Sequence, residues 1–299
     1  MEMFRQILVL VLLGLLEGQR MCKRVHNGKP VFPKLHSVPD SLMKEISMFI
    51  GYAAIAYCDA SSHTSWWNTN IKMLHPKAKL HAEIKVDDTN ALVYYNEPER
   101  HIVATFRGSD SVFRFLSAAS IQKAAYPGVP GATVTRNGLE FATSIRQEIV
   151  ESLEAMRKKY PGYQLVLTGH SLGGVLATLM APMVAEDLKV PPTSIRVITF
   201  NQPRVGNLVF ADHFNSQSFN FTRVTNQNDP VHDYPNFDHG WAHVQREVHV
   251  DDFNVFLQCN NYAVEDPACS FKKSSILAIA TAHLHVGKTK LSPHGCGWW

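Results

Sequence analysis

Hydrophobic positions recur at two different spacings along this chain, and segments with the two spacings alternate. Where apolar residues return every three to four positions, the spacing predicts a helix. Four segments are expected to be helical: Leu42–Tyr57 after a helix start at Pro39-Asp40-Ser41, Leu139–Lys159, Leu172–Asp187 and about Asn207–Asn215. Pro161-Gly162 ends the second of these helices.

Short apolar runs that end at turn residues predict strands. Residues 91–95 and 101–106 are expected to be neighbouring strands, and 164–168, 195–200 and 219–224 to be buried ones. The last three alternate with the helices. This alternation favours an α/β fold, with a mainly parallel central sheet and helices on both faces. Active sites in such folds lie at the carboxyl ends of the strands.

The N-terminal segment has the pattern of a secretory signal peptide. Arg5 precedes an apolar run, Ile7–Leu16, and Gly18 follows as a cleavage point. At ten residues the run is well short of the roughly 20 that span a bilayer as a helix, so no stable membrane span is expected. We predict a secreted, extracellular protein with a signal peptide at 1–18, a pro-segment to about residue 24 and a single domain at 25–299.

Composition limits the function classes further. The chain has 299 residues, 45% hydrophobic and 18% charged, which suits one soluble globular domain. A net charge of +3, with no Lys/Arg-rich run, argues against a nucleic-acid partner. If Cys22 is lost with the pro-segment, four of the five cysteines remain, an even number that suggests two disulfides in an exported protein. A sequon at Asn220 predicts glycosylation and fits export.

One motif indicates chemistry. The segment GHSLGG, residues 169–174, lies between an apolar run and an expected helix. A serine on such a sharp turn would collide with side chains two residues away on either side, and Gly169 and Gly173 remove those collisions. Gly-x-Ser-x-Gly alone occurs by chance, but its setting favours a nucleophile elbow. We predict Ser171 as a catalytic nucleophile and the N–H of Leu172, at the helix N-terminus, as an oxyanion donor.

A catalytic serine needs a base to take its proton and an acid to orient that base. In this type of fold the order along the chain is serine, acid, histidine. Asp229 follows a strand and is the first candidate acid, with Asp233 and Asp238 as rivals. The pattern alone does not separate the candidate bases, which are His232, His239, His243, His249, His283, His285 and His294.

Five segments together resemble the class 3 lipases, a family of secreted fungal-type enzymes that also includes the fungal feruloyl esterases. The segments are FRGS (106–109), GHSLGG (169–174), FNQPRVGN (200–207), RVTNQNDPV (223–231) and AHL (282–284). The resemblance implies an α/β-hydrolase fold with a short helical lid. It also implies a triad of Ser171, Asp229 and His283. His285 is the rival base, because His285-Val286 stands where the family usually has an aromatic pair.

The resemblance also implies roles for residues outside the triad. Ser109 would be the second oxyanion donor, and His243 would be a structural histidine. Two disulfides are implied, Cys58–Cys296 and Cys259–Cys269. The lid would present a mostly apolar surface, although the family's usual tryptophan is absent here; its residues are Val112, Phe113, Phe115, Leu116 and Ile121.

An apolar lid that opens onto oil favours a triacylglycerol lipase acting on lipid esters at the oil–water interface. A feruloyl esterase acting on soluble esters is the alternative, although such enzymes have a more polar segment there. A lipid-binding protein without turnover is the alternative of another class, but all three triad candidates are present. We expect a monomer that needs no cofactor. We also expect no metal, because the sequence has no His-Glu-x-x-His or other recognisable metal-ligand spacing.

Overall fold

The computed structural model describes residues 25–26, 29–30, 35–58, 77–86, 89–109, 122–260, 265–272 and 280–291. The predicted signal peptide, the cleavage sites, Cys296 and the lid residues Val112, Phe113, Phe115, Leu116 and Ile121 lie outside these ranges, so they stay predictions. Among the described residues, no helix is both long enough and apolar enough to cross a membrane.

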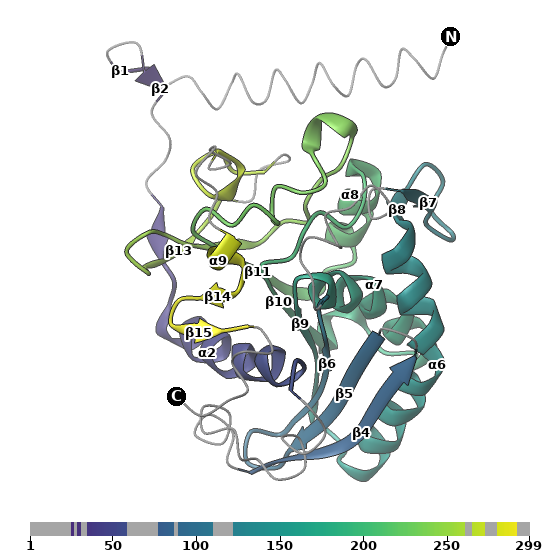
Figure 1. Cartoon of the computed structure of the whole chain (residues 1–299). Helices are drawn as coiled ribbons and strands as arrows, with labels where there is room; N and C mark the ends of the chain where they lie inside the picture. Colours follow the sequence, from purple (N-terminus) through teal and green to yellow (C-terminus); the bar gives the residue numbers. More distant parts are fainter. Residues whose placement is uncertain are drawn as a thin grey trace.

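A nine-stranded sheet forms the centre of the molecule (Figure 1). Its strands follow the order β3 (His36–Ser37), β13 (Phe256–Gln258), β12 (Glu247–Val250), β11 (Asn220–Asn226), β10 (Ile195–Phe200), β9 (Gln164–His170), β6 (His101–Phe106), β5 (Thr89–Asn96) and β4 (Ala78–Val86). The five strands from β12 to β6 pair in parallel, and the strands at both edges pair antiparallel. The carboxyl ends of the parallel strands therefore meet along one edge of the sheet.

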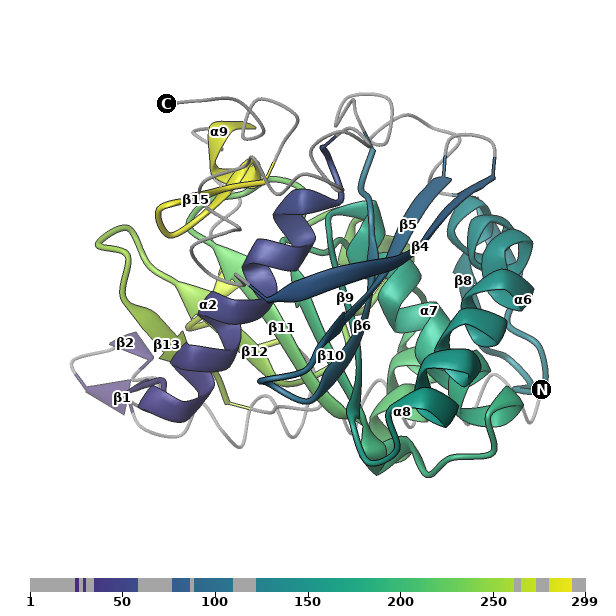
Figure 2. The ribbon, with the colours of Figure 1, turned by 90° about the horizontal axis from the view of Figure 1, so that it is seen from below.

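Helices cover both faces of this sheet (Figure 2). On one face lies α2 (Asp40–Ile55), and on the other lie α6 (Arg136–Lys159), α7 (Leu172–Asp187) and α8 (Leu208–Ser216). Each face has its own apolar core. Helix α6 buries residues three to four positions apart, which gives it one apolar side. Helix α7 is buried almost all round because α6 packs over it against the sheet.

A short C-terminal unit packs against the end of β11 and against α2 (Figure 1). It consists of α9 (Ala280–His283), β14 (His285–Val286) and β15 (Thr289–Lys290). Val286 and Leu291 anchor it in the apolar core on the α2 side. The smaller elements are β1 (Val25–His26), β2 (Lys29–Pro30), β7 (Lys123–Ala125), β8 (Thr133–Thr135) and the 3₁₀ turns η2 (Pro192–Ser194), η3 (Phe237–His239) and η4 (Ser270–Lys272).

The predicted helices and strands are confirmed with small differences at their ends. The sheet is parallel only at its centre, so "mainly parallel" describes the part that carries the site rather than the edges. The strands β4, β12 and β13, which were not predicted, gave weak signals in the sequence. Polar residues occupy many positions of β4, and β12 and β13 have only four and three residues.

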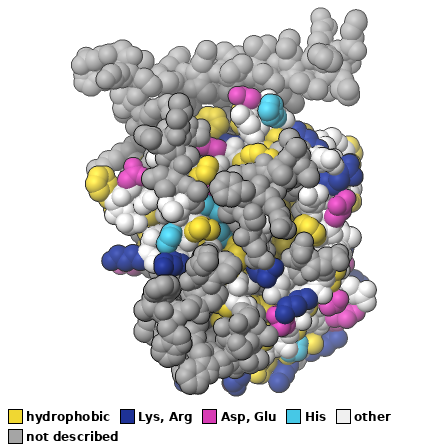
Figure 3. Space-filling view, viewed as in Figure 1, with side chains coloured by type: hydrophobic (Ala, Val, Ile, Leu, Met, Phe, Trp, Pro, Cys, Tyr) yellow, Lys and Arg dark blue, Asp and Glu magenta, His cyan; other side chains and the backbone are white. Residues whose placement is uncertain are grey.

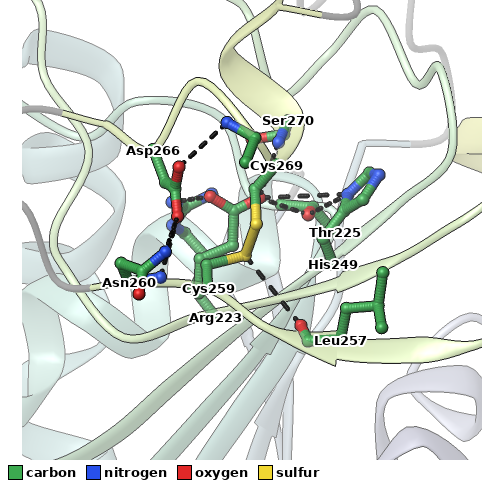
Figure 4. The surroundings of a disulfide bond; sticks show 11 residues. Arg223, Thr225, His249, Leu257, Cys259, Asn260, Asp266, Cys269 and Ser270 are labelled. Carbon is green, nitrogen blue, oxygen red and sulfur yellow. Dashed lines mark hydrogen bonds and ion pairs between the residues drawn. A yellow bond between two sulfur atoms is a disulfide. The ribbon is translucent and has the colours of Figure 1, made fainter. Parts of the chain in front are cut away.

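The predicted Cys259–Cys269 disulfide is confirmed, with a Cα–Cα distance of 6.2 Å (Figure 4). Cys58 is also disulfide-bonded, but its predicted partner Cys296 lies outside the described residues, so that pairing stays a prediction. Asp266 shapes the small loop that the first disulfide closes, because its Oδ2 accepts from the N–H of Asn260 at 2.8 Å. The disulfide lies beside a buried group of polar residues that joins this loop to the sheet.

The described surface carries charges of both signs. On the face shown in Figure 3, Lys and Arg side chains lie close to Asp and Glu side chains rather than in a separate area. Arg146, for example, pairs with Asp187 at 2.7 Å and with Glu186 at 3.0 Å. This mixture accords with the small net charge of +3.

Candidate active site

Ser171 lies at the turn between β9 and α7, at the carboxyl edge of the parallel strands. Its backbone has φ 57° and ψ −126°, a conformation that L residues rarely adopt and that stores strain. Its side chain is buried, at 1% exposure, and its Oγ has no hydrogen-bond partner among the described residues. The elbow predicted from the sequence is therefore present, with the hydroxyl in a protected position.

The glycines around Ser171 are required by close backbone contacts. A Cβ on Gly173 would lie 2.0 Å from the carbonyl oxygen of Phe106, at the end of β6. A Cβ on Gly169 would lie 2.4 Å from the backbone of Gly173. Gly174 has a milder constraint, since its Cβ would lie 3.0 Å from Gln202 Cβ. The two flanking glycines thus let α7 start against the ends of β9 and β6.

Gly173→Ala should disrupt this elbow, because backbone atoms of β6 would have to move. We expect a loss of about 3 kcal/mol in the free energy of unfolding and a strong loss of any Ser171-dependent activity. Gly174→Ala is the matched control, since it adds the same methyl group to the same helix against a side chain. Urea denaturation of both variants measures the difference, and equal stabilities would contradict this account of the elbow.

His283 is bound to Asp229 in a fully buried pair. His283 Nδ1 lies 2.8 Å from Asp229 Oδ2, and the N–H of Val231 donates to the other carboxylate oxygen at 2.8 Å. Because a carboxylate only accepts, Nδ1 carries the proton in this bond, and in a neutral imidazole Nε2 is left with a free lone pair. His283 Nε2 has no hydrogen-bond partner within the described ranges.

His170 lies next to the His283 ring and next to Ser171 in the chain. The His170 and His283 rings lie 4.6 Å apart between centroids, and His170 directly precedes Ser171. The imidazole of His283 therefore lies beside the elbow, although it comes from a distant part of the sequence. Two buried polar atoms without partners, Ser171 Oγ and His283 Nε2, thus belong to the same small region of the described structure.

The rival residues are held elsewhere. His285 Nδ1 lies 2.9 Å from the carbonyl oxygen of Thr281, so its ring turns back on its own segment. Asp233 lies 3.7 Å from Arg204, and Asp238 is exposed in η3. His243 is buried and donates from Nε2 to the carbonyl of His232 at 2.6 Å, which agrees with the predicted structural role.

The two residues predicted as oxyanion donors, Leu172 and Ser109, lie close to the elbow. Leu172 is the first residue of α7, so its N–H has no acceptor one turn earlier in the helix. Ser109 comes shortly after the end of β6, next to Gly108, where a Cβ would lie only 3.1 Å from Ser171 Cβ. The loop that carries Ser109 therefore passes against the elbow. The described residues contain no group of three metal-binding side chains.

Four residues of this region have contacts that were not predicted from the sequence. Tyr57 and His170 hydrogen-bond to each other at 2.7 Å beside the elbow. Asn201 and Asn226 contact the segment that carries His283. Their signal in the sequence was present but weak: each asparagine is a polar residue at the carboxyl end of an apolar strand.

The chain is similar to several known lipases. The family model for Lipase (class 3) matches residues 103–239. The lipase of Rhizomucor miehei is 27% identical over 218 residues, which is 70% of this chain and 59% of that protein. The secreted mono- and diacylglycerol lipase A of Penicillium cyclopium is 31% identical over 189 residues, or 62% of this chain and 60% of that protein.

Solved structures extend the similarity over more of the chain. The lipase of Rhizopus microsporus var. chinensis has a TM-score of 0.80 and 25% identity, with 88% of this chain and 93% of that one covered. A triacylglycerol lipase whose catalytic centre is formed by a serine protease triad also has a TM-score of 0.80, at 25% identity, with coverages of 88% and 100%.

The sheet, its helices and the serine elbow define an α/β-hydrolase fold, as the resemblance implied. Over residues 103–239 the chain is similar to the class 3 lipases, and its fold is that of solved lipases. The matched segment spans 59% of the length of the Rhizomucor miehei lipase.

Proposed function

We propose that this protein is a serine carboxylic-ester hydrolase, a triacylglycerol lipase that works through an acyl-enzyme on Ser171. The observation that carries the proposal is the buried hydrogen bond between Asp229 and His283 beside the Ser171 elbow. A carboxylate on Nδ1 holds the imidazole in the tautomer whose Nε2 accepts a proton, as a serine hydrolase requires.

The proposed reaction has two displacements. His283 Nε2 takes the proton of Ser171 Oγ as that oxygen attacks the ester carbonyl carbon. The N–H of Leu172 and the hydroxyl and N–H of Ser109 donate to the oxyanion that forms. The carbon–oxygen bond of the ester then breaks, and the alcohol leaves with the proton from His283. Water repeats the attack with His283 as base and releases the fatty acid.

A water-insoluble ester suits this chain better than a soluble one. The relatives described above are named lipases. Phe253, in the turn that follows β12, is 87% exposed at the same edge of the sheet as Ser171, where an oil surface would cover it. The predicted apolar lid also favours a water-insoluble ester. The alternative enzyme is a feruloyl esterase that acts on soluble esters. The alternative of another class is a lipid-binding protein without catalytic activity.

Substrate concentration separates the two ester classes. We expect the rate with tributyrin to rise sharply once the substrate exceeds its solubility limit and forms an emulsion, while turnover of methyl ferulate stays low. Pure protein and Ser171→Ala would be assayed in parallel with a pH-stat. Strong turnover of methyl ferulate without activity on the emulsion would contradict the lipase assignment.

We also propose where the protein acts, its oligomeric state and a glycosylation site. The protein is expected to be secreted and monomeric, and the Penicillium relative is named a secreted enzyme. Asn220, the predicted glycosylation site, is exposed at the first position of β11. Thr222 of the same sequon is buried and accepts from Arg196 at 3.0 Å, so a sugar would have to be attached before the sheet closes.

A further inference from the structure

Three polar side chains at the ends of neighbouring strands converge on the backbone that carries His283. His170 is the last residue of β9, Asn201 directly follows β10, and Asn226 is the last residue of β11. These strands are parallel neighbours, and the register places Phe200 between His170 and Val224. The three side chains therefore stand in a row along one sheet edge, where α9 and β14 pack (Figure 1).

Asn201 makes the most contacts of the three. Its Nδ2 donates to the carbonyl oxygens of His283 and His285, both at 2.9 Å, and lies 3.3 Å from that of Ala282. Asn226 Nδ2 donates to Ala282 at 3.0 Å. Each asparagine thus binds main-chain atoms of the His283 segment rather than its imidazole.

His170 supplies a second donor to His283. Burial, and then the neighbouring charge of His283, lower the pKa of His170 well below its ordinary value, so the ring is neutral. His170 Nε2–H donates to the carbonyl oxygen of His283 at 2.7 Å. His170 Nδ1 must then accept, and the hydroxyl of Tyr57 donates to it at 2.7 Å. Tyr57 therefore fixes which nitrogen of His170 serves as the donor.

Asn201 has an unfavourable backbone conformation. Its φ is 47°, and its side chain is fully buried. A non-glycine residue at positive φ is strained, so the surroundings must hold it there. The amide that this conformation places among three carbonyls explains why an asparagine occupies the position rather than an apolar residue.

We propose that Asn201 is a positioning residue for the reaction. With His170 and Asn226 it forms a carbonyl clamp that fixes the main chain of residues 282–285. The clamp keeps His283 Nδ1–H on Asp229 while Nε2 serves Ser171. Helix α9 has only four residues and cannot fix this backbone by its own hydrogen bonds. The inference rests on the proposed function, because it assigns His283 the role of base.

Asn201→Gly tests the clamp with little backbone disturbance, since glycine accepts positive φ. We expect kcat on a soluble short-chain ester to fall about 10-fold to 100-fold, with KM unchanged, because small shifts of a base are costly. Asn254→Gly is the matched control. Asn254 also has positive φ, at 61°, but it lies in the exposed turn after β12, and its replacement should leave kcat at the wild-type value.

A second readout needs no turnover. The proton between His283 Nδ1 and Asp229 should give a far-downfield NMR resonance in the wild type, in Ser171→Ala and in Asn254→Gly. We expect this resonance to broaden or disappear in Asn201→Gly while the circular dichroism spectrum stays unchanged. Wild-type kcat and an intact resonance in Asn201→Gly would overturn the clamp, as would a lower kcat explained entirely by loss of folded protein.

These measurements distinguish failure of the proposed hydrolase function from failure of the carbonyl clamp. If the wild type and Ser171→Ala hydrolyse esters equally, the proposed function is wrong, and the resonance alone then decides whether Asn201 fixes the His283–Asp229 pair. If only Ser171→Ala is inactive and Asn201→Gly matches the wild type in both readouts, the function stands and the clamp falls.

Discussion

Ser171→Ala is expected to lower kcat for ester hydrolysis by about 10⁵-fold, because it removes the nucleophile of both displacements. The variant should fold normally, since the Ser171 hydroxyl makes no hydrogen bond to the described residues. An initial-rate assay with a chromogenic short-chain ester measures the effect, and the melting temperature of the variant serves as the folding control.

The same assay tests whether Ser171 and His283 act as one unit. Each single alanine variant should lose nearly the whole effect, and the double variant Ser171→Ala/His283→Ala should lose little more than either. Losses that multiply in the double variant would show two independent contributions. That result would contradict proton transfer from Ser171 to His283.

Glu247→Gln is expected to produce the largest loss of stability, about 3 to 5 kcal/mol, because it leaves a buried arginine without its counter-charge. Glu247 Oε2 lies 3.0 Å from Arg223 Nη2, and both side chains are almost fully buried. Thr225 Oγ1 donates to the other oxygen at 2.6 Å, and the N–H of Ser270 donates to it at 3.3 Å. Urea denaturation checks the result, with the exposed Glu148→Gln as control.

The same carboxylate predicts a pH dependence of stability. Burial alone would raise the pKa of Glu247, but Arg223, His249 and hydrogen bonds from Ser270 and Thr225 lower it from 4.5 to about 2. Its stabilisation, on the order of 3 kcal/mol, is thus fully present above about pH 4.5 and is lost as the pH falls towards 2. Glu247→Gln should lack this part of the acid destabilisation. Parallel pH curves for wild type and variant would contradict the assignment.

The centre of the fold was predictable from the sequence because local signals agreed there. The apolar runs that became β9, β10 and β11 are bounded by turn residues, and the helix after Ser171 begins and ends at the predicted residues. The edge strands were missed for a physical reason. An edge strand buries fewer side chains, so β4 carries polar residues at positions where a central strand would be apolar.

The site was predictable in part. The glycines of the elbow indicate that the backbone leaves no room for side chains there. The close backbone contacts of Gly169 and Gly173 explain why. The choice of His283 among seven histidines needed the family resemblance, because chain separation hides which imidazole reaches Asp229. Asn201 was missed because its side chain binds carbonyl oxygens of a segment about 80 residues away. No local sequence pattern reveals such a contact.

Covalent labelling tests the central claim most directly. An alkyl phosphonate with a p-nitrophenyl leaving group reacts with a serine that a nearby base has activated. After stoichiometric treatment, mass spectrometry of the digested protein should find one phosphonyl group on the peptide that contains Ser171. Ser171→Ala should take up no label, and His283→Ala should react far more slowly. Labelling of another residue, or an unlabelled protein that still hydrolyses esters, would contradict the account.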